Sequence, residues 1–315
     1  MNKIRLISLS VNNDLAKDIA GYLGIPITGS TLKRFADGEI LFNCEECIRG
    51  DDIYIIQSTC SPANDTLMEV LICVDACKRA GAKSITCVMP YYGYSRQDRK
   101  GDTRQSISAK LVADLLTAAG VNRVLCVDLH ATQIVGFFDF PVDNLSPVNI
   151  FEDRIRLTSN VNNLVCVSPD HGGLVRTTKL ATKLNAPIAI IDKRRPEPNK
   201  SEIVSLVGDV KDKDCIIVDD IVDTAGTLCN AANELKKLGA KSVRAFITHG
   251  VLSEPAVSRI KESELDYCYI TDSIPLTDDK KCDKIIVLSL ANLLANAINN
   301  LEKGLSLGDN YYVKR

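Results

Sequence analysis

The 315-residue sequence has no tryptophan, only three histidines, and aromatic side chains at 5% of all residues. We therefore expect its cores to be built from Ile, Val, Leu and Ala. No apolar run approaches the roughly 18 residues that a membrane-spanning helix needs, so we expect no membrane partner. The net charge of −2 argues against a general nucleic-acid-binding surface, so we expect no nucleic-acid partner either.

The twelve cysteines lie mostly inside apolar segments and at irregular spacings. Such cysteines are typical of small, buried hydrophobic side chains in a reducing compartment, so we expect a cytoplasmic protein. Cys44 and Cys47 form one C-x-x-C pair. A zinc site needs a second pair or a histidine nearby, and the sequence offers neither, which argues against metal or redox use of this pair.

Short apolar segments alternate with amphipathic ones along the whole chain, which is long enough for two domains. This alternation predicts an α/β fold with mainly parallel sheets flanked by helices. The predicted strands are 4–8, 53–57, 84–89, 123–128, 164–168, 188–192, 215–219, 243–248 and 284–288. The predicted helices are 15–23, 66–80, 107–119, 173–184, 227–238 and 290–302.

One segment of the chain is repeated about half a chain later. Residues 80–85, Ala-Gly-Ala-Lys-Ser-Ile, are similar to residues 238–243, Leu-Gly-Ala-Lys-Ser-Val. In each copy the glycine ends a helix and a strand begins behind it, so the sequence indicates a duplicated α/β unit. When the copies are aligned, Gln57–Ser58 falls opposite Asp219–Asp220, and we expect only the second copy to carry the site that these acids build.

The strongest chemical pattern follows the predicted strand 215–219. Asp219 and Asp220 precede a turn, Asp223-Thr224-Ala225-Gly226-Thr227, that opens a helix. Ligands of parallel sheets bind at the carboxyl ends of strands, and such a turn directs N–H groups and hydroxyls toward a phosphate at the helix N-terminus. The two aspartates would then face sugar hydroxyls or a sugar-bound Mg²⁺. A plain surface turn needs only one Asp or Thr as a cap, so we predict a phosphosugar site.

This segment resembles the phosphoribosyl-pyrophosphate motif of type I phosphoribosyltransferases, which leaves open enzymes that consume this compound and the one that makes it. Five further segments, in order along the chain, resemble parts of the ribose-phosphate pyrophosphokinases. They are residues 35–39, 94–100, 127–130, 167–173 and 191–196. The resemblance implies transfer of the pyrophosphoryl group of MgATP to the 1-hydroxyl of ribose 5-phosphate.

The same resemblance implies two tandem type I phosphoribosyltransferase-like domains. Residues 1–145 would form a degenerate N-terminal domain with the ATP-contacting loops, and residues 146–290 the domain with the ribose 5-phosphate site. Residues 291–315 would form a C-terminal helix and tail. The resemblance also implies a homo-oligomer, a hexamer built from dimers, with ATP at an interface between subunits.

Individual roles also follow from the resemblance. ATP would contact Phe35, Asp37, Gly38, Glu39, Arg96 and Gln97, and Mg²⁺ would contact His130 and Asp170. Lys193 and Arg195 would be the catalytic cations, and ribose 5-phosphate would contact Arg195, Asp219, Asp220, Asp223, Thr224, Ala225, Gly226 and Thr227.

From the residues alone some of these roles have alternatives. A lone Phe is more often part of a core, no G-x-x-x-x-G-K-[ST] sequence provides a P-loop, and Mg²⁺ prefers oxygen ligands to His. Structural roles for Phe35 and His130 therefore stay open. Lys193 and Arg195 repel each other unless an anion lies between them, and displacement at phosphorus builds the negative charge that such cations stabilise. A solubilising basic turn is the alternative for this pair.

The family's phosphate- and ADP-responsive site is matched only in part. Arg49, Arg104, Asp143 and Asn144 match its positions. Cys47 and Gly308 stand where the family has serine, and an anion site that loses hydroxyl donors binds more weakly. The departures put control by phosphate or ADP in question.

Two other functions fit parts of the pattern. A phosphoribosyltransferase that modifies a base would need neither the ATP segments nor the cations of residues 193–195. A non-catalytic regulatory subunit of the same fold should have lost a catalytic residue, whereas this sequence keeps all of those proposed above.

Overall fold

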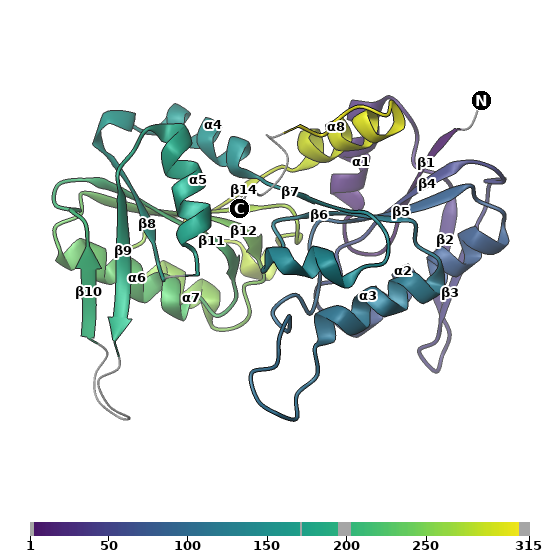
Figure 1. The fold of residues 1–315 in the computed structure, drawn as a ribbon, viewed down its shortest axis with the longest axis horizontal. Coiled ribbons are helices and arrows are strands. Elements are labelled where there is room, and N and C mark those ends of the chain that lie inside the picture. The colour runs from purple at the N-terminus through teal and green to yellow at the C-terminus, as the bar shows by residue number, and fades with distance from the viewer. Residues whose placement is uncertain (1–2, 171, 195–202, 309–315) are drawn as a thin grey trace. The chain divides into compact units, whose positions relative to one another are not determined.

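The computed structural model describes residues 3–170, 172–194 and 203–308, and it confirms the predicted α/β fold of mainly parallel sheets flanked by helices (Figure 1). By its internal contacts the chain divides into two compact units. The first unit consists of Met1–Ser146, Ser273–Pro275 and Ser289–Lys314, and the second of Pro147–Asp272 and Leu276–Leu288.

A five-stranded parallel sheet in the order β1-β4-β5-β6-β7 forms the centre of the first unit. The strands are β1 (Ile4–Ser8), β4 (Asp52–Ile56), β5 (Ser84–Met89), β6 (Arg123–Val127) and β7 (Val142–Leu145). One face is covered by α1 (Asn13–Leu23) and α8 (Ala291–Glu302), and the other by α2 (Ala63–Arg79) and α3 (Ser108–Ala119) (Figure 1). Because both faces are buried, the inner strands are apolar at nearly every position.

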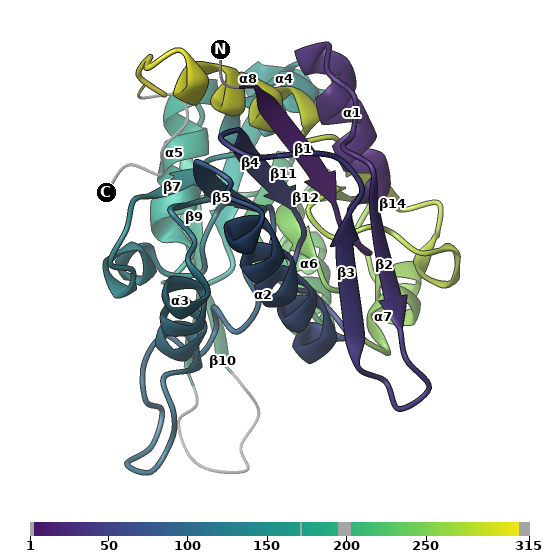
Figure 2. The same ribbon diagram turned by 90° about the vertical axis from the view of Figure 1, so that its right-hand side faces the viewer.

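A two-stranded hairpin, β2 (Ser30–Arg34) and β3 (Ile40–Cys44), stands beside α2 in the first unit (Figure 2). The apolar pattern did not predict these strands, because most of their side chains are polar or only partly buried. An ion pair helps to hold the hairpin, since Arg34 lies 3.3 Å from Asp65 and 3.2 Å from Glu69 on α2.

The second unit has a seven-stranded sheet in the order β10-β9-β8-β11-β12-β13-β14, in which only the β9–β10 pair is antiparallel. The strands are β8 (Leu164–Ser168), β9 (Ile188–Arg194), β10 (Ile203–Val207), β11 (Asp214–Val222), β12 (Ser242–Gly250), β13 (Tyr267–Thr271) and β14 (Ile285–Leu288). One face is covered by α4 (Val148–Thr158) and α5 (Leu174–Leu184), and the other by α6 (Gly226–Lys237) and α7 (Ala256–Glu262) (Figure 1).

The duplication indicated by the sequence is visible in matching contacts of the two units. In the first unit Asp52 pairs with Ser84 across β4 and β5, and the Ser84 hydroxyl donates to the Asp52 carboxylate at 2.5 Å. In the second unit Asp214 pairs with Ser242 across β11 and β12, with the same hydrogen bond at 2.6 Å. Because an aspartate at the strand start and a serine on the next strand recur in the same register, the two units are built on one plan.

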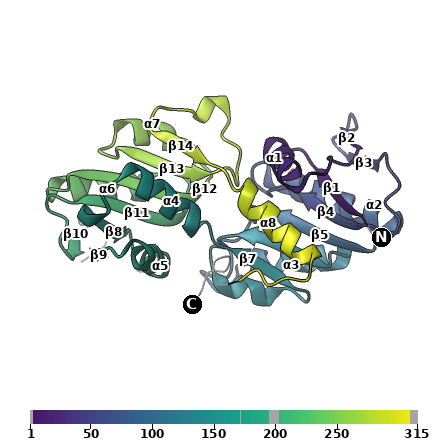
Figure 3. The ribbon, with the colours of Figure 1, turned by 90° about the horizontal axis from the view of Figure 1, so that it is seen from above.

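The C-terminal helix α8 lies beside α1 in the first unit (Figure 3). Leu294 and Ile298 on α8 are fully buried, and Glu302 at its end accepts a hydrogen bond of 2.7 Å from the Tyr54 hydroxyl on β4. The last helix of the chain therefore completes the unit that the first strand begins.

Every predicted strand and helix is present, with ends that shift by a few residues. The prediction missed β2, β3, β7, α4, β10, α7 and β13. The missed strands have only four or five residues, and the formation of such short strands depends on pairing with their neighbours. Nine of the twelve cysteines are buried, and all twelve are free thiols. No helix in the described part of the chain is both long and apolar enough to cross a bilayer.

Candidate active site

The acidic pair lies inside β11 and not at its end, because the strand ends at Val222 and not, as predicted, at Asp219. The strand continues to Val222 because β12 pairs with it as far as Gly250. On its other side β8 pairs with β11 only as far as Ile217. Asp219 and Asp220 therefore sit where β11 has lost one neighbour, at the carboxyl edge of the sheet, and this is where ligands of parallel sheets bind.

The two adjacent carboxylates have different surroundings. Burial first, and then the charge of Asp220, raise the pKa of Asp219. Asp220 is 4% exposed, and its carboxylate forms an ion pair of 3.4 Å with Arg176 on α5. The guanidinium compensates Asp220 and opposes the rise in the pKa of Asp219. Asp220 is therefore paired with a cation, whereas the neighbouring Asp219 resists ionisation.

A short loop with hydrogen-bond donors follows the acidic pair. Ala225 has a φ of 59°, a left-handed conformation that turns the chain into α6 at Gly226. The first backbone hydrogen bond of the helix runs from Cys229 N to Ala225 O at 2.9 Å. The preceding N–H groups of the first turn have no acceptor within the helix, and Thr224 and Thr227 are exposed beside them. Residues 223–227, the phosphate loop, therefore have the form of an anion site at a helix N-terminus.

Asp170 stands at the carboxyl end of β8, the strand next to β11. Its Oδ1 atom accepts a hydrogen bond of 2.9 Å from Gly173 N, just before α5 begins. Its backbone oxygen accepts another of 2.6 Å from the hydroxyl of Ser168, which is fully buried. The first bond orients the carboxylate and the second holds the backbone of Asp170, at the same sheet edge as the acidic pair.

The sequence predicted that the two catalytic cations follow the strand 188–192. Lys193 lies within β9 by its backbone, opposite Val204 of β10, and not in the loop that the sequence predicted. The strand is longer than predicted because β10 returns along it in the antiparallel direction. Arg195 lies outside the described residues, so the catalytic roles of both side chains stay predictions.

His130 belongs to the first unit, where it follows β6. The chain leaves the strand at Asp128, which has a φ of 47°, a conformation that Asp tolerates better than most residues. The side-chain oxygen of Asn144 accepts a hydrogen bond of 3.0 Å from Leu129 N, and His130 is exposed beyond this turn. His130 and Asp170 are therefore fixed in separate units.

The first predicted ATP segment is the turn of the β2–β3 hairpin. Phe35 N donates to Glu39 O at 2.8 Å, and Glu39 N donates to the Asp37 side chain at 3.1 Å. Gly38 has a φ of 94°, which favours glycine. Phe35 is 54% exposed, so it is not the core residue that the alternative interpretation required.

The second predicted ATP segment precedes α3. Gln97 is held by its side chain and by its backbone. Its side-chain oxygen accepts a hydrogen bond of 2.6 Å from the Ser108 hydroxyl, and its backbone oxygen accepts one of 3.2 Å from Ala109 N. Arg96 is exposed next to it. An exposed cation on an anchored segment can reach a polyphosphate.

Sequence reasoning missed two side chains that support the site. Arg176 carries no motif of its own, and its spacing of six residues after Asp170 was the only available signal. Asn144 matched a position of the regulatory site, but in this structure it is 6% exposed and holds the turn before His130. Asp143 beside it is ion-paired with Arg123.

No cluster of three His, Cys, Asp or Glu side chains that could hold a metal occurs among the residues that the structure describes. This is compatible with Mg²⁺, which usually keeps several waters and binds through one or two carboxylates together with substrate phosphates. The carboxylate of Asp170 fits this pattern, whereas the imidazole of His130 is a less common ligand.

Comparisons with known proteins cover nearly the whole chain. Residues 4–120 match the N-terminal domain of ribose phosphate pyrophosphokinase, and residues 149–283 match the phosphoribosyl transferase domain. The ribose-phosphate pyrophosphokinase of Bacillus caldolyticus is 52% identical over 300 residues, which is 95% of each chain. That of Oceanobacillus iheyensis is 52% identical over 297 residues, 94% of this chain and 93% of the relative.

A solved structure with the same fold points to the same family. The phosphoribosylpyrophosphate synthetase of Mycobacterium smegmatis is 41% identical, with a TM-score of 0.91 over 96% of this chain and 100% of that one. On the identity and coverage of these relatives, the chain belongs to the ribose-phosphate pyrophosphokinase family.

Proposed function

We propose that the chain transfers the pyrophosphoryl group of ATP to the 1-hydroxyl of ribose 5-phosphate, which gives 5-phosphoribosyl 1-pyrophosphate and AMP. The observation that carries this function is the continuous run from the acidic pair on β11 into the phosphate loop of α6, in a chain of this family. It offers carboxylates for a sugar and N–H donors for a phosphate on one strand–turn–helix unit.

In this mechanism the phosphate loop binds the 5-phosphate of ribose, and Asp219 and Asp220 accept hydrogen bonds from the ribose hydroxyls. The 1-hydroxyl oxygen attacks the β-phosphorus of ATP in line, the bond from that phosphorus to the α–β bridging oxygen breaks, and AMP leaves with this oxygen. The attacking hydroxyl gives up its proton to solvent water as the new oxygen–phosphorus bond forms. The chemistry needs positioning and charge neutralisation more than a covalent intermediate.

Other residues of the chain have roles in this proposal. Phe35, Asp37, Gly38, Glu39, Arg96 and Gln97 bind ATP, Lys193 and Arg195 stabilise the charge of the transferred group, and Arg195 also contacts the sugar phosphate. His130 and Asp170 would hold Mg²⁺. When bound, Mg²⁺ neutralises charge on the phosphate oxygens.

At the level of the whole protein, we propose a cytoplasmic homo-oligomer, a hexamer by resemblance to its family, with no nucleic-acid or membrane partner. We also propose that residues 1–145 and 146–290 form two domains and that residues 291–315 form a C-terminal helix and tail. The proposal does not include control by phosphate or ADP, because Cys47 and Gly308 stand where the family has serine.

The function is tested by incubating the purified protein with ribose 5-phosphate, ATP and Mg²⁺ and following the ³¹P spectrum. We expect AMP and a sugar-bound diphosphate to grow together. ADP in place of AMP would mean ordinary phosphoryl transfer and would refute the attack at the β-phosphorus. No reaction, with or without added phosphate, would favour a regulatory subunit, and turnover of 5-phosphoribosyl 1-pyrophosphate with a base would favour a phosphoribosyltransferase.

A further inference from the structure

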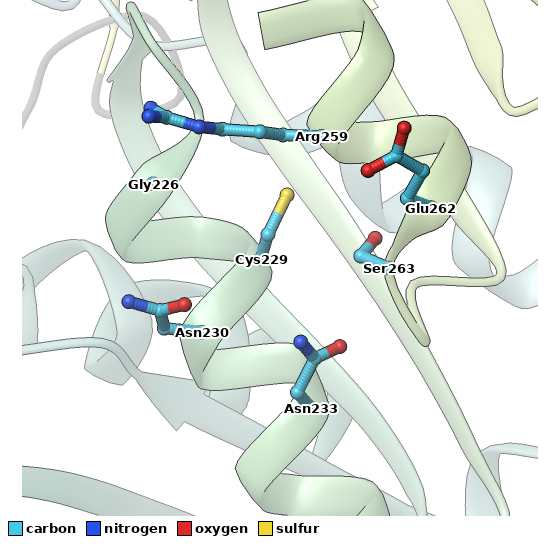
Figure 4. Close-up of a pocket in the computed structure, with 7 residues that line it drawn as sticks. All are labelled: Gly226, Cys229, Asn230, Asn233, Arg259, Glu262 and Ser263. Carbon is cyan, nitrogen blue, oxygen red and sulfur yellow. The ribbon is translucent and has the colours of Figure 1, made fainter.

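An arginine from a neighbouring helix contacts the backbone of the phosphate loop. Helix α7 packs beside α6 and extends Arg259 toward the start of α6 (Figure 4). Its Nη1 atom donates a hydrogen bond of 2.9 Å to the backbone oxygen of Thr224. The same atom lies 3.4 Å from the point that a Cβ atom on Gly226 would occupy. The guanidinium therefore holds one loop carbonyl and lies against the residue that opens the helix.

This contact fixes a part of the loop that would otherwise be costly to order. Ala225 has a positive φ, which is unfavourable for a residue with a side chain. The bond from Arg259 to the carbonyl of the preceding residue opposes rotation of this peptide. A phosphate site built from backbone N–H groups binds well only if those groups have their orientation before the ligand arrives.

A pocket gives solvent access to the guanidinium. It has a volume of about 400 Å³ and lies between α6 and α7. Asn230 and Asn233 from α6 and Glu262 from α7 line it together with Arg259 (Figure 4). A small cation can therefore reach the position of the Arg259 head group from solvent.

We propose that Arg259 is a positioning residue for the ribose 5-phosphate site, which acts through the backbone of Thr224 and has no contact with the reacting atoms. The inference rests on the proposed function, because it assigns the phosphate loop to ribose 5-phosphate. It gives Arg259 an effect on the KM for ribose 5-phosphate and none on the KM for ATP.

The test compares Arg259→Ala with Lys261→Ala, which removes an exposed cation from the same helix. For Arg259→Ala we expect the KM for ribose 5-phosphate to rise roughly tenfold, which corresponds to the loss of one charge-assisted hydrogen bond. The KM for ATP should stay within about twofold, as expected when only one ligand's site is loosened. Arg259→Lys, which keeps the charge but not the planar donor, should lie between the wild type and Arg259→Ala.

Chemical rescue separates positioning from folding. Millimolar guanidinium ion should enter the pocket and lower the raised KM of Arg259→Ala while leaving the wild type and Lys261→Ala unchanged. An unchanged KM for ribose 5-phosphate, an equal rise in both KM values, or no rescue in a variant with the wild-type melting temperature would overturn the inference. If the proposed function fails, the wild type itself forms no AMP, which is a different result from an active wild type that Arg259→Ala matches.

Discussion

Asp219 and Asp220 are neighbours in sequence but differ in what surrounds them. Asp220 has the guanidinium of Arg176 at 3.4 Å, whereas burial and the charge of Asp220 raise the pKa of Asp219. A buried carboxylate beside another is costly for the free protein. We interpret this cost as part of the site's function, because hydroxyl donors of a bound sugar would relieve it.

Replacing Asp219 by Asn should therefore stabilise the folded protein and lower its activity. The substitution removes the repelled charge and keeps the shape, so we expect the free energy of unfolding at pH 8 to rise by about 1 kcal/mol, or a few degrees in melting temperature. Activity should fall at least about 100-fold, the loss typical for a group that orients the substrate. Calorimetry and the AMP assay measure the two effects, and a destabilised variant with normal activity would contradict both.

The stability difference should depend on pH in one direction. Because the pKa of Asp219 is raised in the folded protein, the unfolded chain ionises first as pH rises from about 4. The wild type then loses stability until pH passes the pKa of Asp219 in the folded protein, whereas Asn does not titrate and the variant has no such loss. The gap in melting temperature should be small at pH 4 and largest at pH 9. An equal gap at both values would show that the pKa is not raised.

Arg176 should set the pH range of activity. Its charge opposes the rise in the pKa of Asp219, so Arg176→Ala raises this pKa further. We expect the acid limb of kcat/KM for ribose 5-phosphate to move about one unit toward higher pH. Arg176→Lys keeps the charge and should leave the limb near its original position. An unmoved limb in Arg176→Ala would mean that Asp219 titrates independently of this cation.

Contiguous site residues could be predicted from the sequence, and through-space partners could not. Asp219, Asp220 and the phosphate loop form one strand–turn–helix run, so spacing alone places them together. Arg176 and Asn144 act across the fold, from a helix and a neighbouring strand. Only the packing of these elements reveals their roles.

The hairpin β2–β3 shows what an element contributes that a motif does not. The sequence identified residues 35–39 as a loop, and the structure adds the two strands that present it. The strands have no clear apolar pattern, since most of their side chains are polar or only partly buried. An element formed by pairing of this kind lies beyond the reach of apolar periodicity.

Gly38→Ala should distort this hairpin turn. Gly38 has a φ of 94°, and an alanine there should cost about 1–2 kcal/mol or shift the turn. We expect the KM for ATP to rise severalfold while the KM for ribose 5-phosphate stays constant. Gly21→Ala is the matched control, because Gly21 lies in α1 with nothing within 4 Å of an added Cβ, and it should be neutral or stabilising. Equal effects of the two variants on ATP would remove the hairpin turn from the ATP site.

The two copies of the α/β unit have different residues at the position of the acidic pair. Where the second copy has Asp219 and Asp220, the first has Gln57 and Ser58, both fully buried. The Gln57 amide donates to Glu69 on α2 at 2.7 Å. The duplicated plan was readable from the repeated sequence, but the network that closes the first copy was not, because its partners come from distant segments.

Placing an acid at this position of the first copy should destabilise the protein and create no second ribose 5-phosphate site. Ser58 is fully buried, and it donates two hydrogen bonds, from its N–H to Asn12 Oδ1 at 2.6 Å and from its hydroxyl to Ser273 O at 2.5 Å. Ser58→Asp places a charge next to these oxygens, and we expect the free energy of unfolding to fall by about 3 kcal/mol or more. Ser58→Ala, the control, should cost about 1 kcal/mol. Titration calorimetry should give one ribose 5-phosphate per chain for the wild type and both variants; a second bound equivalent in Ser58→Asp would show that the first copy still has the form of a binding site.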